Sequence, residues 1–192
     1  MNKEMKYDCC LVICHGKSEL IFSKNIKSNL RLKFETFAKK NGNVSIQITG
    51  LMNVLNSRDF KSLTNFRRKY TLYIKKGKIK NFIVFIIMDF DEQEYTPEIK
   101  NNYLNKSMFK GHFLYDYIVP IYNDLNFDDV MRSVGFSIDV KNKVKSYNKI
   151  FPGENGDYEQ FKVIKERLSQ TKKSNISILF EYLDQIYNNK KM

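Results

Sequence analysis

The sequence predicts an α/β fold built on a mainly parallel sheet, and three observations lead to that prediction. Short apolar runs of strand length alternate with amphipathic segments of helical periodicity over the first two thirds of the chain. Residues 82–88 are apolar at every position, as in a strand covered on both faces. The last third has helical patterns alone. We therefore expect a four-stranded sheet flanked by helices, followed by a helical C-terminal segment.

Four segments are expected to form the strands. Residues 7–14 are a nearly continuous apolar run that ends abruptly at the sequence HGKS. Residues 44–49 alternate apolar and polar side chains with a period of two, which is typical of a half-buried strand. Residues 82–88 form the third strand and residues 113–122 the fourth, where Pro120 suits a sheet edge or a strand end.

Helices are expected between these strands. The first should follow the glycine turn and end near Lys40. Its apolar residues are spaced three or four residues apart, or a multiple of that spacing, as on one face of a helix. These residues are Phe22, Ile26, Leu30, Phe34 and Phe37. A second helical region carries a stripe formed by Phe60, Leu63, Phe66, Tyr70 and Tyr73. Such a stripe is more typical of a core than of a platform on which bases stack.

Three more helix signals follow. Thr96 and Pro97 have the types favoured at an N-cap and at the first helical position. Asn126 resembles another N-cap, with Asp128 and Asp129 in its first turn. Those two acids could also bind a metal, but we interpret them as a helix start. The last helix has one apolar face, formed by Ile176, Leu179, Phe180, Leu183, Ile186 and Tyr187.

The length and composition bound the organisation of the chain. With 192 residues, of which 42% are hydrophobic, it fits one ordered domain. We expect an α/β domain over residues 1–125 and a helical extension over residues 126–192 packed on it. No apolar run reaches the roughly 20 residues that cross a bilayer, and the start lacks a signal peptide, so we expect a cytoplasmic protein without a membrane partner. Cys9, Cys10 and Cys14 lie in one apolar run, which favours free thiols over a zinc site.

The net charge of +12 favours a polyanionic partner, namely DNA or RNA. The basic residues cluster in the sequences RKY, KKGKIK, KNKVK and a KK pair at Lys172. A Lys-rich and Asn-rich composition unrelated to function is the alternative explanation.

Two acids at the end of the third strand indicate a metal site. Asp89 and Asp91 are two residues apart, so in extended backbone their carboxylates point to the same side. Two such carboxylates repel each other unless a cation lies between them. A hard divalent cation, Mg²⁺ or Mn²⁺, prefers oxygen ligands of this kind. Loop acids that only cap the next helix are the alternative.

The turn after the first strand carries the second group of candidate residues. In open parallel sheets ligands bind at the carboxyl ends of the strands, and the HGKSE turn reaches the same edge as Asp89. Lys17 and the backbone amides beside it lie where a helix N-terminus holds phosphate. Glu19 could be a metal ligand or only a partner of the helix dipole, and Lys17 could be a solvated surface lysine.

Both motifs, in this order, resemble the Toprim domain. The resemblance covers Tyr7 to about Tyr122 and is nearest to the small RloB-like and AbiL-like phage-defence proteins related to the OLD nucleases. Their first motif resembles E-G-x-[ST]-E, and this chain has His15, Gly16, Lys17, Ser18 and Glu19 there. His15 therefore replaces the glutamate that the family is thought to use as a general acid or base or as a metal ligand.

The resemblance implies a Toprim-like sheet and a Mg²⁺-dependent nuclease that cuts DNA or RNA in antiphage defence, with a partner ATPase. Asp89, Asp91 and Glu19 would hold the metal, and His15 or Lys17 would assist proton transfer or bind phosphate. Because imidazole is a poor Mg²⁺ ligand, whether the chain is an enzyme stays open. The alternative is a degenerate Toprim domain that binds nucleic acid or a protein. A small-molecule binder that uses the HGKS turn as a phosphate loop is a further alternative function. A homo-oligomer is a partner arrangement that also stays open.

Overall fold

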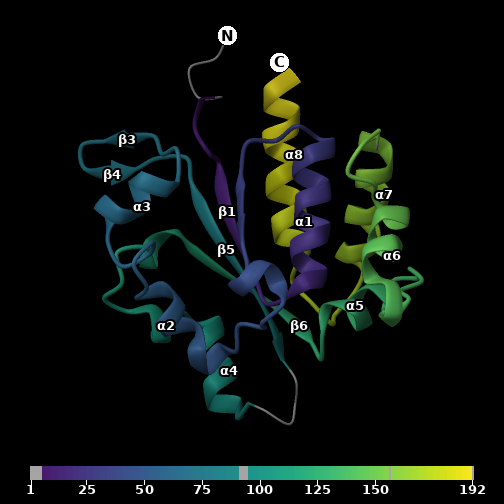
Figure 1. Cartoon of the computed structure of the whole chain (residues 1–192), viewed down its shortest axis with the longest axis horizontal. Helices are drawn as coiled ribbons and strands as arrows, with labels where there is room; N and C mark the ends of the chain where they lie inside the picture. Colours follow the sequence, from purple (N-terminus) through teal and green to yellow (C-terminus); the bar gives the residue numbers. More distant parts are fainter. Residues whose placement is uncertain (1–5, 91–94, 156, 192) are drawn as a thin grey trace.

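The computed structural model describes residues 6–90, 95–155 and 157–191 and has an α/β architecture (Figure 1). The main sheet in these residues has four strands, all parallel, in the order β2-β1-β5-β6. They are β1 (Cys10–Cys14), β2 (Glu35–Phe37), β5 (Ile83–Phe90) and β6 (Ile118–Asp124). The predicted four-stranded sheet flanked by helices, with a helical C-terminal segment, is confirmed.

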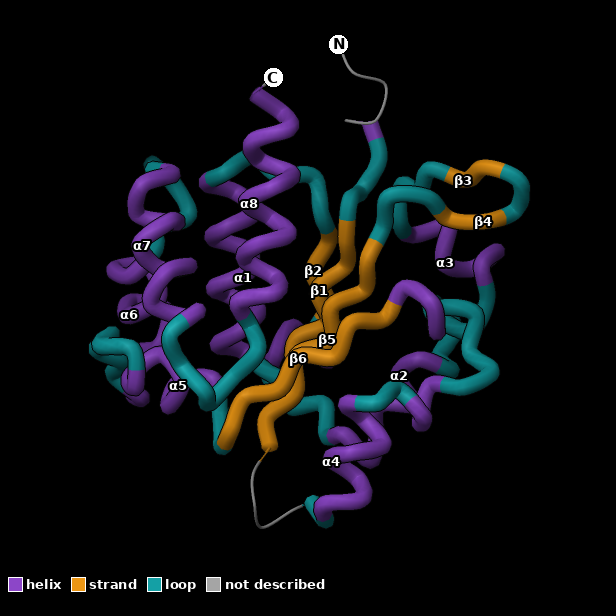
Figure 2. The backbone as a smooth tube through the Cα atoms, turned by 180° about the vertical axis from the view of Figure 1, so that it is seen from behind, coloured by secondary structure: helices purple, strands orange, loops and turns teal. Residues whose placement is uncertain are grey.

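Helices cover both faces of the sheet (Figure 2). One face is covered by α1 (Lys17–Asn29), α5 (Phe127–Ser133), α6 (Lys143–Ile150), α7 (Tyr158–Ser169) and α8 (Ser177–Lys191). The other face is covered by α2 (Leu51–Leu55), α3 (Leu63–Lys69) and α4 (Pro97–Leu104), beside a small antiparallel hairpin of β3 (Ile74–Lys75) and β4 (Lys78–Ile79). The residues just before β1 and the C-terminal end of α8 lie at the same end of the sheet (Figure 1).

The strands divide the core into two layers because successive side chains point to opposite faces. Val12 and Phe85 belong to the layer under α1 and the C-terminal helices. Leu11 and Val84 belong to the layer on the other face. Side chains of α5 to α8 thus share a core with β1 and α1, and the C-terminal segment packs directly on the sheet domain.

The first helix is shorter than its periodicity predicts. It ends at Asn29, because Arg31 adopts a left-handed conformation with φ of 51° and Leu32 N donates to the carbonyl of Lys27 at 3.1 Å. Phe34 and Phe37 continue the apolar spacing but lie beyond the helix, and Phe37 is in β2. The spacing therefore reflects two separate buried segments.

The strand predicted over residues 44–49 is wrong, and β2 at Glu35–Phe37 takes its place in the sheet. Burial does alternate there, since Ile46 and Ile48 are buried and the residues between and beside them are not. The segment is an extended loop followed by a short 3₁₀ turn, and Ile46 N donates to the carbonyl of His15 at 2.9 Å. The alternation thus belongs to a loop bound to the turn after β1.

The aromatic stripe of the second helical region spans more than one element. Phe66 lies in α3, whereas Phe60 precedes that helix and Tyr70 follows it. All three are buried in one core layer, which confirms that this part of the stripe is core, whereas Tyr73 is half-buried and lies outside that layer. The hairpin of β3 and β4 was not predicted.

Most other boundaries agree with the sequence. β6 starts at Ile118, five residues later than predicted, because residues 115–117 form a 3₁₀ turn. Thr96 Oγ1 accepts a hydrogen bond from Ile99 N, and Asn126 Oδ1 accepts one from Asp129 N, so both predicted N-caps are confirmed. Among the described helices, none has the length and apolar character needed to cross a membrane.

Candidate functional site

The carboxyl ends of three neighbouring strands bring polar side chains together. His15 directly follows β1, and Asp89 is the penultimate residue of β5. Asp89 shares a face with Phe85 and Ile87, which pack in the layer under α1. Asp91, the second acid of the predicted pair, lies outside the described residues.

Glu19 is buried at the start of α1. Gly16 is the N-cap, and its N–H donates to Glu19 Oε2 at 3.1 Å, so the glutamate reaches back over the first turn. The side chain is in the third helical position, and the residue is 3% exposed. The pKa of Glu19 is raised to about 8, mainly by burial and also by the nearby charge of Asp89, while His15 opposes the shift.

Asp89 is a second carboxyl with a raised pKa, and its side chain is 13% exposed. The pKa of Asp89 is raised to about 7, mainly by desolvation and also by the nearby charge of Asp128. Asn123 Nδ2 donates to Asp89 Oδ1 at 2.9 Å and favours the charged form. Asn123 is the register partner of Asp89 on β6 and is fully buried. The two acids Glu19 and Asp89 thus occupy one site in which ionising both is unfavourable.

His15, the first residue of the first motif, lies beside Asp89 of the second motif. Its Nε2 atom is 3.8 Å from Asp89 Oδ2, beyond hydrogen-bonding distance but close enough for an ionic contact. Its Nδ1 atom is buried and has no hydrogen-bond partner among the described residues. A buried ring nitrogen without a partner costs free energy, so a ligand or water that supplies one would be favoured there.

Asp128 joins the same site, and its position at a helix start was predicted correctly. The residue lies in the first turn of α5, as predicted, but its carboxyl is buried. Tyr147 Oη donates to Asp128 Oδ1 at 2.7 Å, and Lys143 Nζ lies 2.6 Å from Oδ2. Burial acts to raise the pKa of Asp128, but hydrogen bonds from Lys143, Tyr147 and Ser18 outweigh it and hold the pKa below its usual range.

Asn123, Asp128, Lys143 and Tyr147 were not predicted as site residues. A usable signal exists for Asn123 and Asp128. Asn123 lies near the end of β6, a third strand that ends at this edge, and Asp128 follows soon after it. Lys143 and Tyr147 lie on α6, which packs against α1. Only the packing of the C-terminal helices places them at the site, and no local motif shows it.

Lys17 differs from the other predicted residues. It is the first residue of α1, and its side chain is exposed. The backbone at Lys17 packs closely against Gly42, because a Cβ atom built on Gly42 would be 2.7 Å from Lys17 Cα. The structure therefore brings His15, Glu19 and Asp89 together, whereas the side chain of Lys17 is exposed at the surface.

The chemistry of the site fits a hard divalent cation. Glu19 and Asp89 supply carboxylate oxygens, and a cation between them would relieve their mutual repulsion. Within residues 6–90, 95–155 and 157–191 no group of three His, Cys, Asp or Glu residues is arranged as a metal site. Two carboxylates completed by water or substrate phosphate are nevertheless a common Mg²⁺ arrangement.

Comparisons of the chain with protein families, curated proteins and solved structures gave no match. The resemblance to Toprim domains stays a prediction from the two motifs.

Proposed function

We propose that this protein is a nuclease that depends on a divalent metal, Mg²⁺ or Mn²⁺, and cuts phosphodiester bonds of DNA or RNA. The observation that carries the proposal is the pair of carboxyls with raised pKa values, the buried Glu19 and the largely buried Asp89, at the carboxyl edge of a parallel sheet. The net charge of +12 supports a polyanionic substrate.

The cation would be held by Glu19 and Asp89, with Asp91 as a further ligand predicted from the sequence. Asn123 would keep the carboxylate of Asp89 in its orientation through the 2.9 Å hydrogen bond. When bound, the metal supplies Lewis acidity and neutralises the charge that develops on phosphate.

The remaining residues would bind the substrate and move a proton. His15 Nδ1 has an unused hydrogen-bonding position and could accept a proton from water or donate one to the leaving oxygen. Lys17, exposed at the N-terminus of α1, could hold a phosphate together with the helix amides. In this proposal the protein acts in the cytoplasm, in antiphage defence beside a partner ATPase, as the resemblance to RloB-like and AbiL-like proteins implies.

A second candidate function has its own support. The ion pair between Lys143 and Asp128 places a cationic group of the chain beside the site, and the ring of His15 lies 3.8 Å from the carboxylate of Asp89. Such groups can replace a metal in a degenerate site. The protein would then bind nucleic acid or a partner protein without cutting.

Cleavage assays separate the two candidates. Plasmid, single-stranded DNA and tRNA would be incubated with Mg²⁺ or Mn²⁺ and wild type, Glu19→Gln, Asp89→Asn, or Asp89→Ala with Asp91→Ala. Asp116→Asn, at an exposed carboxyl, is the matched control. The proposal predicts cleavage by wild type and Asp116→Asn, abolished by EDTA, and a loss of at least about 100-fold in the site variants.

Cleavage that survives the site substitutions would disprove this mechanism. Binding of nucleic acid without cleavage, with either metal and with the partner ATPase present, would favour the degenerate module.

A further inference from the structure

A pocket lies at the opposite end of the sheet from the acidic site. Its volume is about 890 Å³, within the range of small-molecule sites. Its walls come from the residues before β1, the end of α1, the segment between β4 and β5, and the end of α8. These segments meet at the end of the sheet where α8 ends (Figure 1).

The pocket is separate from the candidate nuclease site. Cys9 lines the pocket just before β1, and His15 follows the same strand. Six residues of extended chain span about 20 Å. A ligand of nucleotide size in this pocket would not reach Glu19 or Asp89, so the inference does not depend on the proposed nuclease activity.

The lining is strongly basic. Its six cationic side chains are those of Lys24, Lys27, Arg31, Lys33, Lys80 and Lys190. Its two carboxyls, on Asp8 and Glu35, are already engaged. Lys27 Nζ lies 2.8 Å from Glu35 Oε1, and Asp8 Oδ2 accepts a hydrogen bond from Thr71 N at 2.7 Å.

Most of the other cations of the pocket lack a compensating acid. Lys33 is near the carboxyl of Asp8, whereas Lys190 donates to the backbone carbonyl of Arg31, which leaves the charge of Lys190 in place. Lys24, Arg31 and Lys80 form no ion pair with any carboxylate of residues 6–90, 95–155 and 157–191. Several uncompensated cations around one cavity produce a field that attracts an anion.

An aromatic pair forms another part of the wall. The rings of Tyr7 and Tyr73 both line the pocket, with centroids 5.3 Å apart and planes inclined at 35°. Both rings are partly exposed, so each can offer area to a flat ligand. Aromatic side chains of this kind can stack on any nucleic-acid base, because every base has a flat π-face.

We propose that this pocket binds a nucleoside phosphate, with the phosphate held by the uncompensated cations and the base against the tyrosine pair. The ligand chemistry is the same for a free nucleotide and for the terminal nucleotide of a nucleic-acid strand. A cavity of about 890 Å³ has room for either.

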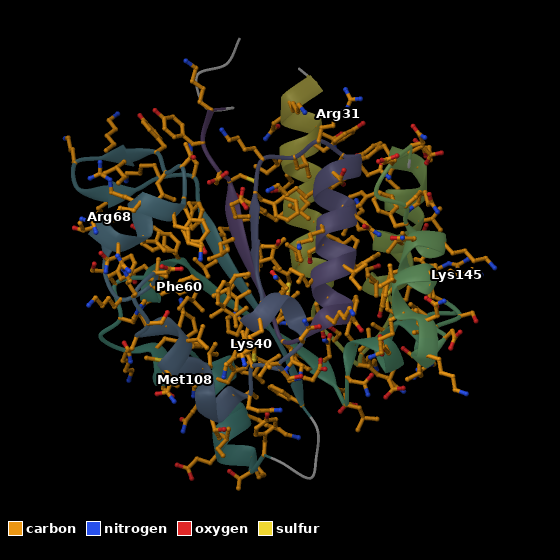
Figure 3. All side chains as sticks on the ribbon, viewed as in Figure 1. Arg31, Lys40, Phe60, Arg68, Met108 and Lys145 are labelled. Carbon is orange, nitrogen blue, oxygen red and sulfur yellow. The ribbon has the colours of Figure 1, made fainter. Side chains whose placement is uncertain are left out.

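Binding can be measured by calorimetry with the full chain. The probes are AMP, ATP, GTP, adenosine, inorganic phosphate and a short oligonucleotide with or without a 5′-phosphate. Arg31→Gln combined with Lys80→Gln removes two pocket charges. Lys145→Gln on α6 is the matched control, and Figure 3 labels Arg31 and Lys145 at separate places on the surface.

Cys9 provides an independent reporter of occupancy. It lines the pocket and is partly exposed, whereas Cys10 and Cys14 are fully buried. Alkylation of the native protein by a small thiol reagent should therefore modify Cys9 first, and a bound ligand should slow it. Cys9→Ser confirms which thiol reacts.

We expect at least one nucleotide to bind wild type and Lys145→Gln equally, to bind the double variant about tenfold or more weakly, and to protect Cys9. Preference for the mononucleotides identifies a free nucleotide, and preference for the 5′-phosphorylated oligonucleotide identifies a strand end. Absence of binding by every probe, equal binding by the double variant, or phosphate binding as tightly as the nucleotides would overturn the proposal. None of these outcomes bears on cleavage at Glu19 and Asp89.

Discussion

Asn123 and Asp89 face each other across β6 and β5, and Asn123 Nδ2 donates to Asp89 Oδ1 at 2.9 Å. The orientation of Asn123 is itself determined by the C-terminal segment, because Ser174 Oγ donates to Asn123 Oδ1 at 2.9 Å. Ser174 Oγ in turn accepts a hydrogen bond from Ile176 N. The helical segment thus holds an acid of the candidate site in place through a buried amide.

Replacing that amide should destabilise the fold. Asn123→Ala leaves the buried groups of Asp89 and Ser174 without a partner, so we expect the free energy of unfolding to fall by about 1–3 kcal/mol. Urea unfolding followed by circular dichroism measures it. Asn105→Ala, which removes an exposed hydrogen bond to Ser107 N, should cost less than about 0.5 kcal/mol. Equal losses in the two variants would show that the amide has no special structural role.

Stability of the metal-free protein should depend on pH through Glu19 and Asp89. Their pKa values rise from 4.5 and 3.8 to about 8 and about 7, so the folded state holds more protons than the unfolded state between these limits. Their stabilising contribution is complete below about pH 4, falls by about 1.4 kcal/mol per pH unit for each proton, and is gone above about pH 8.

The carboxyl-to-amide variants isolate this effect. In EDTA, the decline in unfolding free energy with rising pH should be shallower for Asp89→Asn than for wild type, and unchanged for Asp116→Asn. Urea titrations at several pH values between about 4 and 8 measure the slopes. Parallel curves for wild type and Asp89→Asn would contradict the raised pKa of Asp89.

Gly42 should be required for the geometry of the turn that carries His15 to Glu19. Its φ is +81°, and an added Cβ would lie 2.7 Å from Lys17 Cα. Gly111 has a φ of +83° with open space around it, so Gly111→Ala measures the conformational cost alone, about 1–2 kcal/mol. We expect Gly42→Ala to lose more stability than Gly111→Ala in urea unfolding. If the two losses are equal, the close approach of the loop to Lys17 is not a constraint.

Tyr147 should stabilise the buried carboxylate of Asp128. Tyr147→Phe removes the 2.7 Å hydrogen bond while keeping the packed ring, and we expect a loss of about 1–3 kcal/mol in unfolding free energy. Tyr122→Phe removes only an exposed 3.4 Å contact with the carbonyl of Lys172 and should have little effect. A neutral Tyr147→Phe would mean that Lys143 and Ser18 alone satisfy Asp128.

The sequence predicts three of the four strands and part of the candidate site, and the reason is local. Buried parallel strands are continuous apolar runs, so β1 and β5 are visible, and the residues that follow them meet at one edge. His15, Glu19 and Asp89 were found in this way. Thr96 and Asn126 were found because an N-cap depends on a few neighbouring residues.

What the sequence did not predict depends on contacts between distant segments. β2 has only three residues, all half-buried, so the strand is too short to show a detectable alternation. The loop at Ile46 has the sequence pattern of a strand because its burial alternates. Lys143 and Tyr147 reach the site only through the packing of α6 on α1. The position of Asp128 at a helix start was predicted correctly, but the hydrogen bond that its buried carboxyl accepts from Tyr147 was not predicted.

Binding of Mn²⁺, measured by electron paramagnetic resonance at near-neutral pH, tests most directly whether Glu19 and Asp89 form a metal site. We expect wild type and Asp116→Asn to bind Mn²⁺, Mg²⁺ to displace it, and both Glu19→Gln and Asp89→Asn to lose it while circular dichroism shows that they remain folded. Mn²⁺ binding that is the same in wild type and in both site variants, or no binding by wild type, would contradict the account.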